Sequence, residues 1–109
     1  MVESALALDM IFKSFADATR RDILKRVYKG DLTITEIARP YDMSFAAIAK
    51  HVAVLEKGRL IFKKRRGKEQ VISANPKTVT LAASHLHGYE RAWQQRYDKL
   101  ESLLNTKGE

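Results

Sequence analysis

Apolar positions near the start of the chain recur at the spacing of an amphipathic helix. Leu8, Ile11, Phe12 and Phe15 share one helical face. Leu6 and Met10 lie off that face, so this first helix has more apolar surface than one core contact covers. The surplus fits either a second subunit or ordinary core packing.

Two further helices are indicated by capping residues. Asp17 and Gly30 are placed to begin and end a second helix. Its apolar face contains Ile23, Leu24, Val27 and Tyr28. Thr33 and Glu36 have the spacing of a capping box, which predicts a short third helix from this point.

A fourth helix follows after a tight turn. Ser44 is placed to cap its start, and Gly58 is placed to end it. Its inward face carries Ile48, Val52 and Leu55. Two short helices that flank a tight turn make a helix-turn-helix, which we place at about residues 33–57.

The periodicity changes after Leu60, where residues typical of strands replace the helical pattern. Val71 and Ile72 belong to a returning strand. The tip between the strands contains Arg66, Gly67 and Lys68. We therefore expect a two-stranded β-hairpin, or wing, at about residues 60–74.

Asn75 and Pro76 indicate the start of a long last helix, with the asparagine as its cap and the proline in its first turn. Apolar residues then recur at steps of three and four: Leu86, Tyr89, Trp93, Tyr97, Leu100 and Leu104. This stripe is typical of a helix-packing seam, so we expect a dimerisation helix at about residues 76–104. Gly88 either bends or interrupts it.

Length and composition indicate one small domain. The chain has 109 residues, of which 45% are hydrophobic, so we expect a single mostly α (α+β) winged helix-turn-helix domain over residues 1–109. It has no cysteine, which excludes disulfides and cysteine-bound metals. No apolar run approaches the roughly 20 residues that span a bilayer, and no signal-peptide pattern is present. We therefore expect a cytoplasmic protein.

The net charge of +7 comes from one short segment. Lys57–Lys68 reads KGRLIFKKRRGK, with seven basic residues and no acidic one, and the rest of the chain is formally neutral. Such a patch suits a polyanion, because each neutralised phosphate releases condensed counterions. The alternative is a solvated loop.

The order of these elements resembles the ArsR-type family of winged helix-turn-helix transcriptional regulators. The strings that carry the resemblance are FADATRRDIL, EIA, MSFAAIAKHVAVLEKGRLI and RRGK, within roughly residues 8–104. The resemblance implies a homodimer built from the first and last helices. It also implies binding to a near-palindromic operator in double-stranded DNA and repression of transcription.

The candidate DNA-binding residues lie on the outer face of the fourth helix and on the hairpin: Ser44, Phe45, Ala46, Ala49, Lys50, His51, Lys63, Arg65, Arg66 and Lys68. The helix face has few hydrogen-bonding side chains, so we expect sparse direct readout of bases. His51 either donates to a phosphate or packs partly buried. An arginine at the hairpin tip suits a narrow minor groove, and plain backbone contact is the alternative. The candidate dimer-interface residues are Leu8, Phe12, Leu86, Tyr89, Trp93, Tyr97 and Leu100.

We expect no metal and no cofactor. Family members often sense metals through cysteines at the positions of Thr33 and Thr35, where threonine cannot replace a thiolate. Another family site on the last helix falls on Pro76, Thr78, Tyr89 and Ala92, none of which is a usual metal ligand. The nearby residues His85, His87, Asp98 and Glu101 are out of register with that site. Zinc needs a convergent tetrahedral set, so ordinary surface or interface roles are expected for the two histidines.

The sequence also bears on two other function classes. An enzyme is disfavoured, because the chain has three histidines, no glycine-rich phosphate loop and no nucleophile motif. A winged helix that binds RNA or an acidic protein through its basic hairpin remains the alternative to a DNA-binding regulator.

Overall fold

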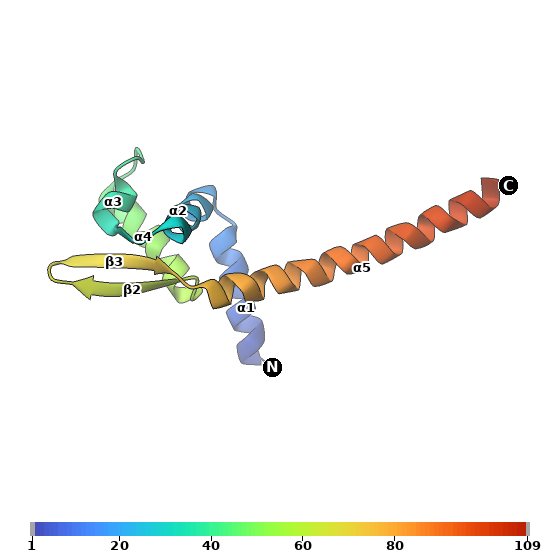
Figure 1. The fold of residues 1–109 in the computed structure, drawn as a ribbon, viewed down its shortest axis with the longest axis horizontal. Helices are drawn as coiled ribbons and strands as arrows, with labels where there is room; N and C mark the ends of the chain where they lie inside the picture. The colour runs from blue at the N-terminus through green and yellow to red at the C-terminus, as the bar shows by residue number, and fades with distance from the viewer. Residues whose placement is uncertain (1, 109) are drawn as a thin grey trace. The chain divides into compact units, whose positions relative to one another are not determined.

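The computed structural model describes the backbone of residues 2–108 and the side chains of residues 5–105. Within them the elements are, in chain order, α1 (Val2–Phe15), α2 (Ala18–Lys29), β1 (Leu32–Thr33), α3 (Ile34–Ala38), α4 (Phe45–Lys57), β2 (Ile61–Arg66), β3 (Glu69–Ala74) and α5 (Pro76–Gly108) (Figure 1). The chain divides into two units, the first ending at Val79 and the second beginning at Thr80 within α5. In the described part of the chain, no helix is long and apolar enough to cross a membrane.

Short-range caps position the helices of the first unit. The Asp17 carboxylate accepts the Arg20 backbone N–H at the start of α2. Thr33 and Glu36 form the expected capping box at the start of α3. The Ser44 hydroxyl accepts the Ala47 N–H at the start of α4. These three predicted caps are confirmed. Each cap joins residues three positions apart, so the sequence alone reveals it.

The core of the first unit lies where α2, α3 and α4 meet the sheet. Its fully buried side chains include Ile23, Val27, Ile37, Ile48, Val52, Leu55, Leu60 and Ile72. The inward face expected for α4 is therefore confirmed. Burial of one face of α4 leaves the opposite face available to other molecules.

The sheet has three strands in the order β1-β3-β2, and both pairings are antiparallel. The predicted hairpin is confirmed as β2 and β3, and Gly67 at its tip has φ of +62°, a conformation that favours glycine. The third strand, β1, was not predicted. It pairs Leu32 with Ile72 and Thr33 with Val71, and a two-residue strand is too short to show an alternating pattern.

Helix α5 is continuous from Pro76 to Gly108, so Gly88 does not interrupt it. At its start, the carbonyl of Asn75 accepts the Val79 N–H, as expected of a residue that flanks a helix. The side chain of Asn75 makes two contacts that the sequence did not reveal. Its amide donates to the Arg59 carbonyl at 2.8 Å and to the Thr78 hydroxyl at 3.1 Å.

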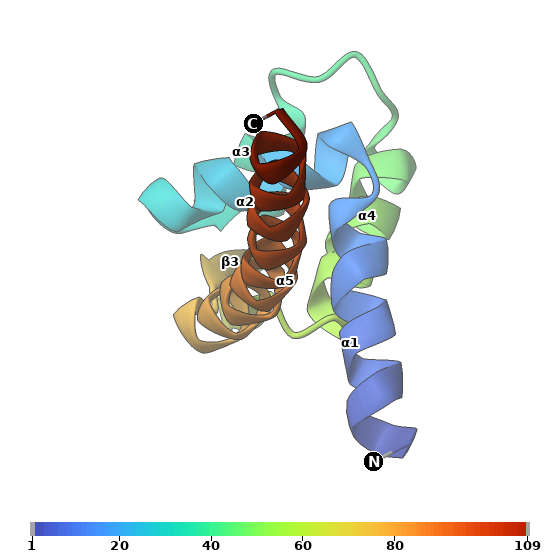
Figure 2. The same ribbon diagram turned by 90° about the vertical axis from the view of Figure 1, so that its right-hand side faces the viewer.

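Helices α1 and α4 pack side by side, and Gly58 sets how closely they approach (Figure 2). A Cβ atom on Gly58 would lie 2.6 Å from the Ser14 hydroxyl and 3.2 Å from the Met10 carbonyl oxygen. Ser14 is fully buried and donates to the Met10 and Val54 carbonyls. Gly58 ends α4 as predicted, but its own φ is an ordinary −75°. The left-handed residue is Arg59, with φ of +59°.

We predict that Gly58→Ala lowers the free energy of unfolding by about 1–3 kcal/mol, because the added methyl overpacks a site closed by a hydrogen-bonded hydroxyl and a backbone carbonyl. Denaturant unfolding measures the change. Gly30→Ala is the matched control, since nothing lies within 4 Å of its Cβ position and its φ of 171° is extended. The control should stay within about 0.5 kcal/mol of the unmodified protein. Equal stability of the two variants would contradict the close packing at Gly58.

Candidate nucleic-acid interface

The outer face of α4 is exposed and carries little hydrogen-bonding capacity. Ala46, Lys50 and Ala53 are exposed, and Ala49 is half-buried. Phe45, the first residue of the helix, is 57% exposed. The Ser44 hydroxyl already accepts a backbone hydrogen bond as the cap of the helix. Lys50 is therefore the main polar side chain that α4 presents on this face.

The basic side chains of β2 divide between the two faces of the hairpin. Successive residues of a strand point to opposite faces, so Lys63 and Arg65 share one face while Lys64 and Arg66 share the other. All four are exposed. Among the described residues, none of them forms an ion pair with a carboxylate. The positive charge of the wing is therefore not neutralised within the first unit.

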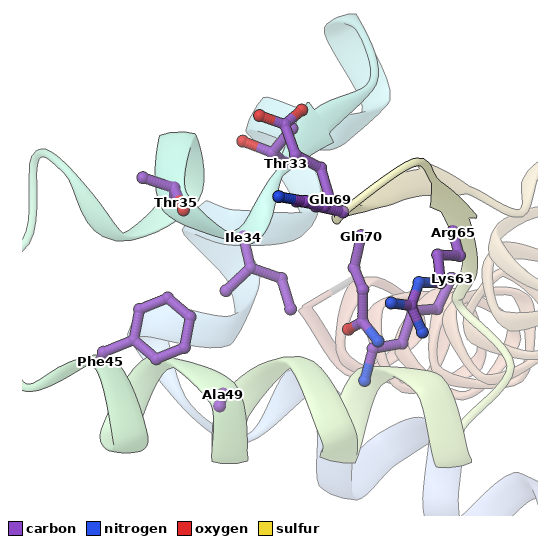
Figure 3. A pocket seen from close by; sticks show the side chains of 10 residues that line it. Thr33, Ile34, Thr35, Phe45, Ala49, Lys63, Arg65, Glu69 and Gln70 are labelled. Carbon is purple, nitrogen blue, oxygen red and sulfur yellow. The ribbon is translucent and has the colours of Figure 1, made fainter.

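A groove of about 450 Å³ lies between the start of α3, the first half of α4 and the hairpin (Figure 3). Its apolar side is formed by Ile34, Phe45 and Ala49. Lys63 and Arg65 line the opposite side, as the strand alternation requires. Lys68 also lines the groove, from the hairpin tip. The structure thus brings five of the predicted contact residues into one concave surface.

Gln70 is a groove residue that the sequence analysis missed. It pairs with Arg65 across the hairpin, which places both side chains on the same face. Its amide can both donate and accept hydrogen bonds, in contrast to the lysines and arginines around it. The alternation of β3 opposite the basic residues of β2 was the signal that could have identified it.

His51 does not point freely outward from α4. Its Nδ1 lies 3.3 Å from an Arg20 guanidinium nitrogen and 3.8 Å from an Asp17 carboxylate oxygen, and 21% of its side chain is exposed. Because Arg20 can only donate, it holds His51 with Nδ1 as the acceptor and Nε2 carrying the proton. The same guanidinium donates to the Lys13 and Ser14 carbonyls. Arg20 thus joins the end of α1 to α4. His51 is partly buried, which is one of the two positions that the sequence allowed for it.

The carboxylates that cap α2 and α3 are held in their ionised form. The backbone N–H of Arg20 lowers the pKa of Asp17, assisted by the backbone N–H of Thr19. The backbone N–H of Thr33 lowers the pKa of Glu36, assisted by the Thr33 hydroxyl. A lowered pKa in the folded state means that each cap stabilises the fold above the ordinary carboxyl range and loses this effect as the pH falls.

Arg26 holds the turn of the helix-turn-helix. Its guanidinium donates to the Ile37 carbonyl at 2.8 Å and to the Glu36 carbonyl at 3.1 Å, which are both in α3. It also lies over the ring of Tyr41, 5.3 Å from the centroid. The Tyr41 hydroxyl donates in turn to Asp22 of α2. Burial, followed by this hydrogen bond, raises the pKa of Tyr41.

Helix α5 presents a long apolar stripe to solvent. Its exposed large apolar residues are Leu81, Leu86, Tyr89, Trp93, Tyr97, Leu100, Leu103 and Leu104. Trp93 is 70% exposed, which is unusual for so large an apolar side chain. On α1, the two other predicted interface residues, Leu8 and Phe12, are half-buried.

The described residues contain no group of three or more potential ligands that could hold a metal ion. His87 Nδ1 instead lies 3.6 Å from a Glu90 carboxylate oxygen, one turn along the exposed surface of α5. Thr33 serves as the cap of α3, and Thr35 is exposed beside the groove.

The helix-turn-helix with an adjacent basic hairpin places the chain in the winged-helix class. No protein-family model matches it. Its sequence is 28% identical to an HTH-type transcriptional regulator of Mycobacterium tuberculosis over 101 residues, which cover 93% of this chain and 92% of the relative. It is 42% identical to the HTH-type regulator YuzN of Bacillus subtilis over 74 residues, 62% of this chain and 80% of YuzN. The transcriptional repressor SdpR of Bacillus subtilis is 32% identical over 68 residues, 62% of this chain and 76% of SdpR.

Solved structures that resemble this chain are also transcriptional regulators. A crystal structure of an ArsR family transcriptional regulator matches with a TM-score of 0.76 and 29% identity, covering 83% of this chain and 93% of that one. An ArsR-like regulator from Rhodococcus sp. RHA1 has the same fold, with a TM-score of 0.76 and 24% identity over 93% of this chain and 95% of that one. The chain belongs to the ArsR family of winged-helix transcriptional regulators. The proteins it resembles are regulators rather than enzymes, as the sequence analysis expected.

Proposed function

We propose that the protein is a homodimeric repressor that binds a near-palindromic operator in double-stranded DNA. Helix α4 enters the major groove of each half-site, and the wing follows the neighbouring backbone. The observation that carries the proposal is the groove in which Phe45 and Ala49 of α4 face Lys63 and Arg65 of the wing. A recognition helix and unpaired cations that share one concave surface suit a strand of duplex DNA.

The proposed DNA contacts have different tasks. Lys63 and Arg65, with Arg66 and Lys68 near the tip, supply charge to phosphates, which positions the protein without reading sequence. Lys50 is the residue of α4 best suited to reach a guanine or a phosphate. His51 contributes through its Nε2 proton, since its Nδ1 is occupied by Arg20.

The apolar stripe of α5 supports the proposed dimer. An exposed stripe that contains Leu86, Trp93 and Leu100 at heptad spacing is stabilised when a second copy of the same helix covers it. A two-fold axis then presents two α4 helices to two symmetry-related half-sites, about one turn of DNA apart. The half-buried Leu8 and Phe12 of α1 extend this proposed interface.

We further propose that the regulator does not sense metals. Thr33 is committed to the α3 cap, and the family positions on α5 carry no usual ligands.

The first prediction from this proposed function concerns the wing. Lys63→Ala combined with Arg65→Ala should weaken binding to specific and random duplex alike. The slope of log affinity against log salt should fall by about two units per subunit, at roughly 0.9 per phosphate contact. Fluorescence anisotropy over a series of salt concentrations measures both quantities, with a structured RNA as a third ligand.

The matched control removes the same charge elsewhere: Lys25→Ala with Lys29→Ala, both exposed on α2. Its salt slope should stay close to that of the unmodified protein. An unchanged slope in the wing variant would show that the basic hairpin is a solvated loop. Tighter binding to structured RNA than to any duplex would favour the alternative of an RNA-binding module.

The second prediction concerns the oligomer. Trp93→Asp should dissociate the dimer at micromolar concentration, because it buries a charge in the centre of the apolar stripe. Sedimentation velocity measures the change, and circular dichroism reports whether the helices remain. Gln95→Asp adds the same charge to exposed α5 outside the stripe and should leave a dimer. A well-folded monomer for the unmodified protein at micromolar concentration would contradict the proposal.

The third prediction concerns metals. Zinc, cadmium and arsenite should leave DNA affinity unchanged, because the described residues offer no convergent set of ligands. Affinity measured with and without each ion, in a buffer free of chelator, tests this. A stoichiometric zinc site that His85→Ala and His87→Ala together remove would overturn it.

A further inference from the structure

The groove beside α4 has a chemical asymmetry that phosphate binding alone does not explain. Its apolar side consists of Phe45, which is 57% exposed, with the half-buried Ile34 and Ala49 behind it (Figure 3). An exposed phenylalanine at the first position of a recognition helix contributes no hydrogen bond to a base or phosphate. Its contribution to binding has to come from covering an apolar group.

The ligand that fits must combine negative charge with an apolar group a short distance away. Lys63, Arg65 and Lys68 line the groove together with one carboxylate, Glu69, so its charged side chains carry a net positive charge. In the major groove of DNA the 5-methyl group of thymine is the apolar feature that base edges present. A DNA strand whose phosphate meets Lys63 and Arg65 can bring such a methyl group to Phe45.

We propose that Phe45 and Ala49 form a contact surface for a thymine 5-methyl group, and that this surface sets the base preference of each half-site. The inference rests on the proposed DNA-binding function and assigns its specificity to an apolar contact. Ala46 and Ala53 contribute no hydrogen-bonding side chain to the neighbouring surface of α4, which leaves Lys50 as the polar side chain there. The half-site therefore contains a required thymine, and most of its remaining positions tolerate change.

The aromatic ring of Phe62 provides an internal comparison. It is also exposed, at 49%, but alternation along β2 puts it on the face opposite to Lys63 and Arg65. It lines no part of the groove beside α4. Both phenylalanine rings are thus exposed, but only Phe45 of the two lies on α4 and lines the groove with Lys63 and Arg65.

The test separates the methyl group from every other feature of thymine. Binding sites are first selected from a random-sequence duplex pool with the unmodified protein. The enriched duplex is then synthesised with deoxyuridine in place of thymidine, one position at a time, which removes the methyl group and keeps base pairing. Loss of one buried methyl contact should weaken binding about fourfold. Replacement at two symmetry-related positions should weaken it about fifteenfold in a dimer.

The variants complete a double-mutant cycle. Phe45→Ala should lose most of the preference for thymine over uracil, because Ala49 alone covers little of the methyl group, while Phe62→Ala should keep the full preference. Circular dichroism confirms folding, and Phe45→Leu, which keeps an apolar side chain, should retain part of the preference.

Each outcome decides a different question. If no sequence is enriched from the pool, the proposed operator-binding function fails. If a sequence is enriched but uracil binds as well as thymine at every position, the function stands and the methyl contact is wrong. A thymine preference that is undiminished in Phe45→Ala also overturns the assignment to Phe45.

Discussion

Burial of one face of α4 is the constraint on which the rest of the first unit depends. Ile48, Val52 and Leu55 are at most 1% exposed, because α4 packs on α1, α2, α3 and β2. Because residues occupy fixed angular positions around a helix, burial of one face also determines which residues face outward. The close approach at Gly58 and the guanidinium of Arg20 then hold the helix against α1. The outer face is presented on a rigid support.

The wing places two of its cationic side chains, Lys63 and Arg65, beside α4. A run of basic residues along a strand does not form one patch, because alternate side chains point to opposite faces. Antiparallel pairing with β3 aims Lys63 and Arg65 at the first half of α4. In the proposed complex with DNA, the wing contributes long-range electrostatic attraction and α4 contributes short-range contacts.

Helix α5 differs from α4, because its large apolar side chains are exposed. Leaving Trp93, Tyr97 and several leucines in water is unfavourable, since each is a large apolar surface. For a small domain, association is an effective way to bury such surface. In the proposed dimer, a second copy of α5 covers this surface.

The sequence by itself determined the helices, their caps, the hairpin and the concentration of charge in the wing. These features depend on residues close together along the chain, as with Thr33 and Glu36 or the tip at Gly67, so local rules suffice to predict them. The tertiary structure decided which side chains meet. The pairing of β1 with β3, the contact of Arg20 with His51 and the grip of Arg26 on α3 join distant segments. Even Gly58, correctly predicted to end α4, is required because Ser14 of another helix lies against it. Such contacts depend on how the elements pack in three dimensions, which periodicity and capping signals do not specify.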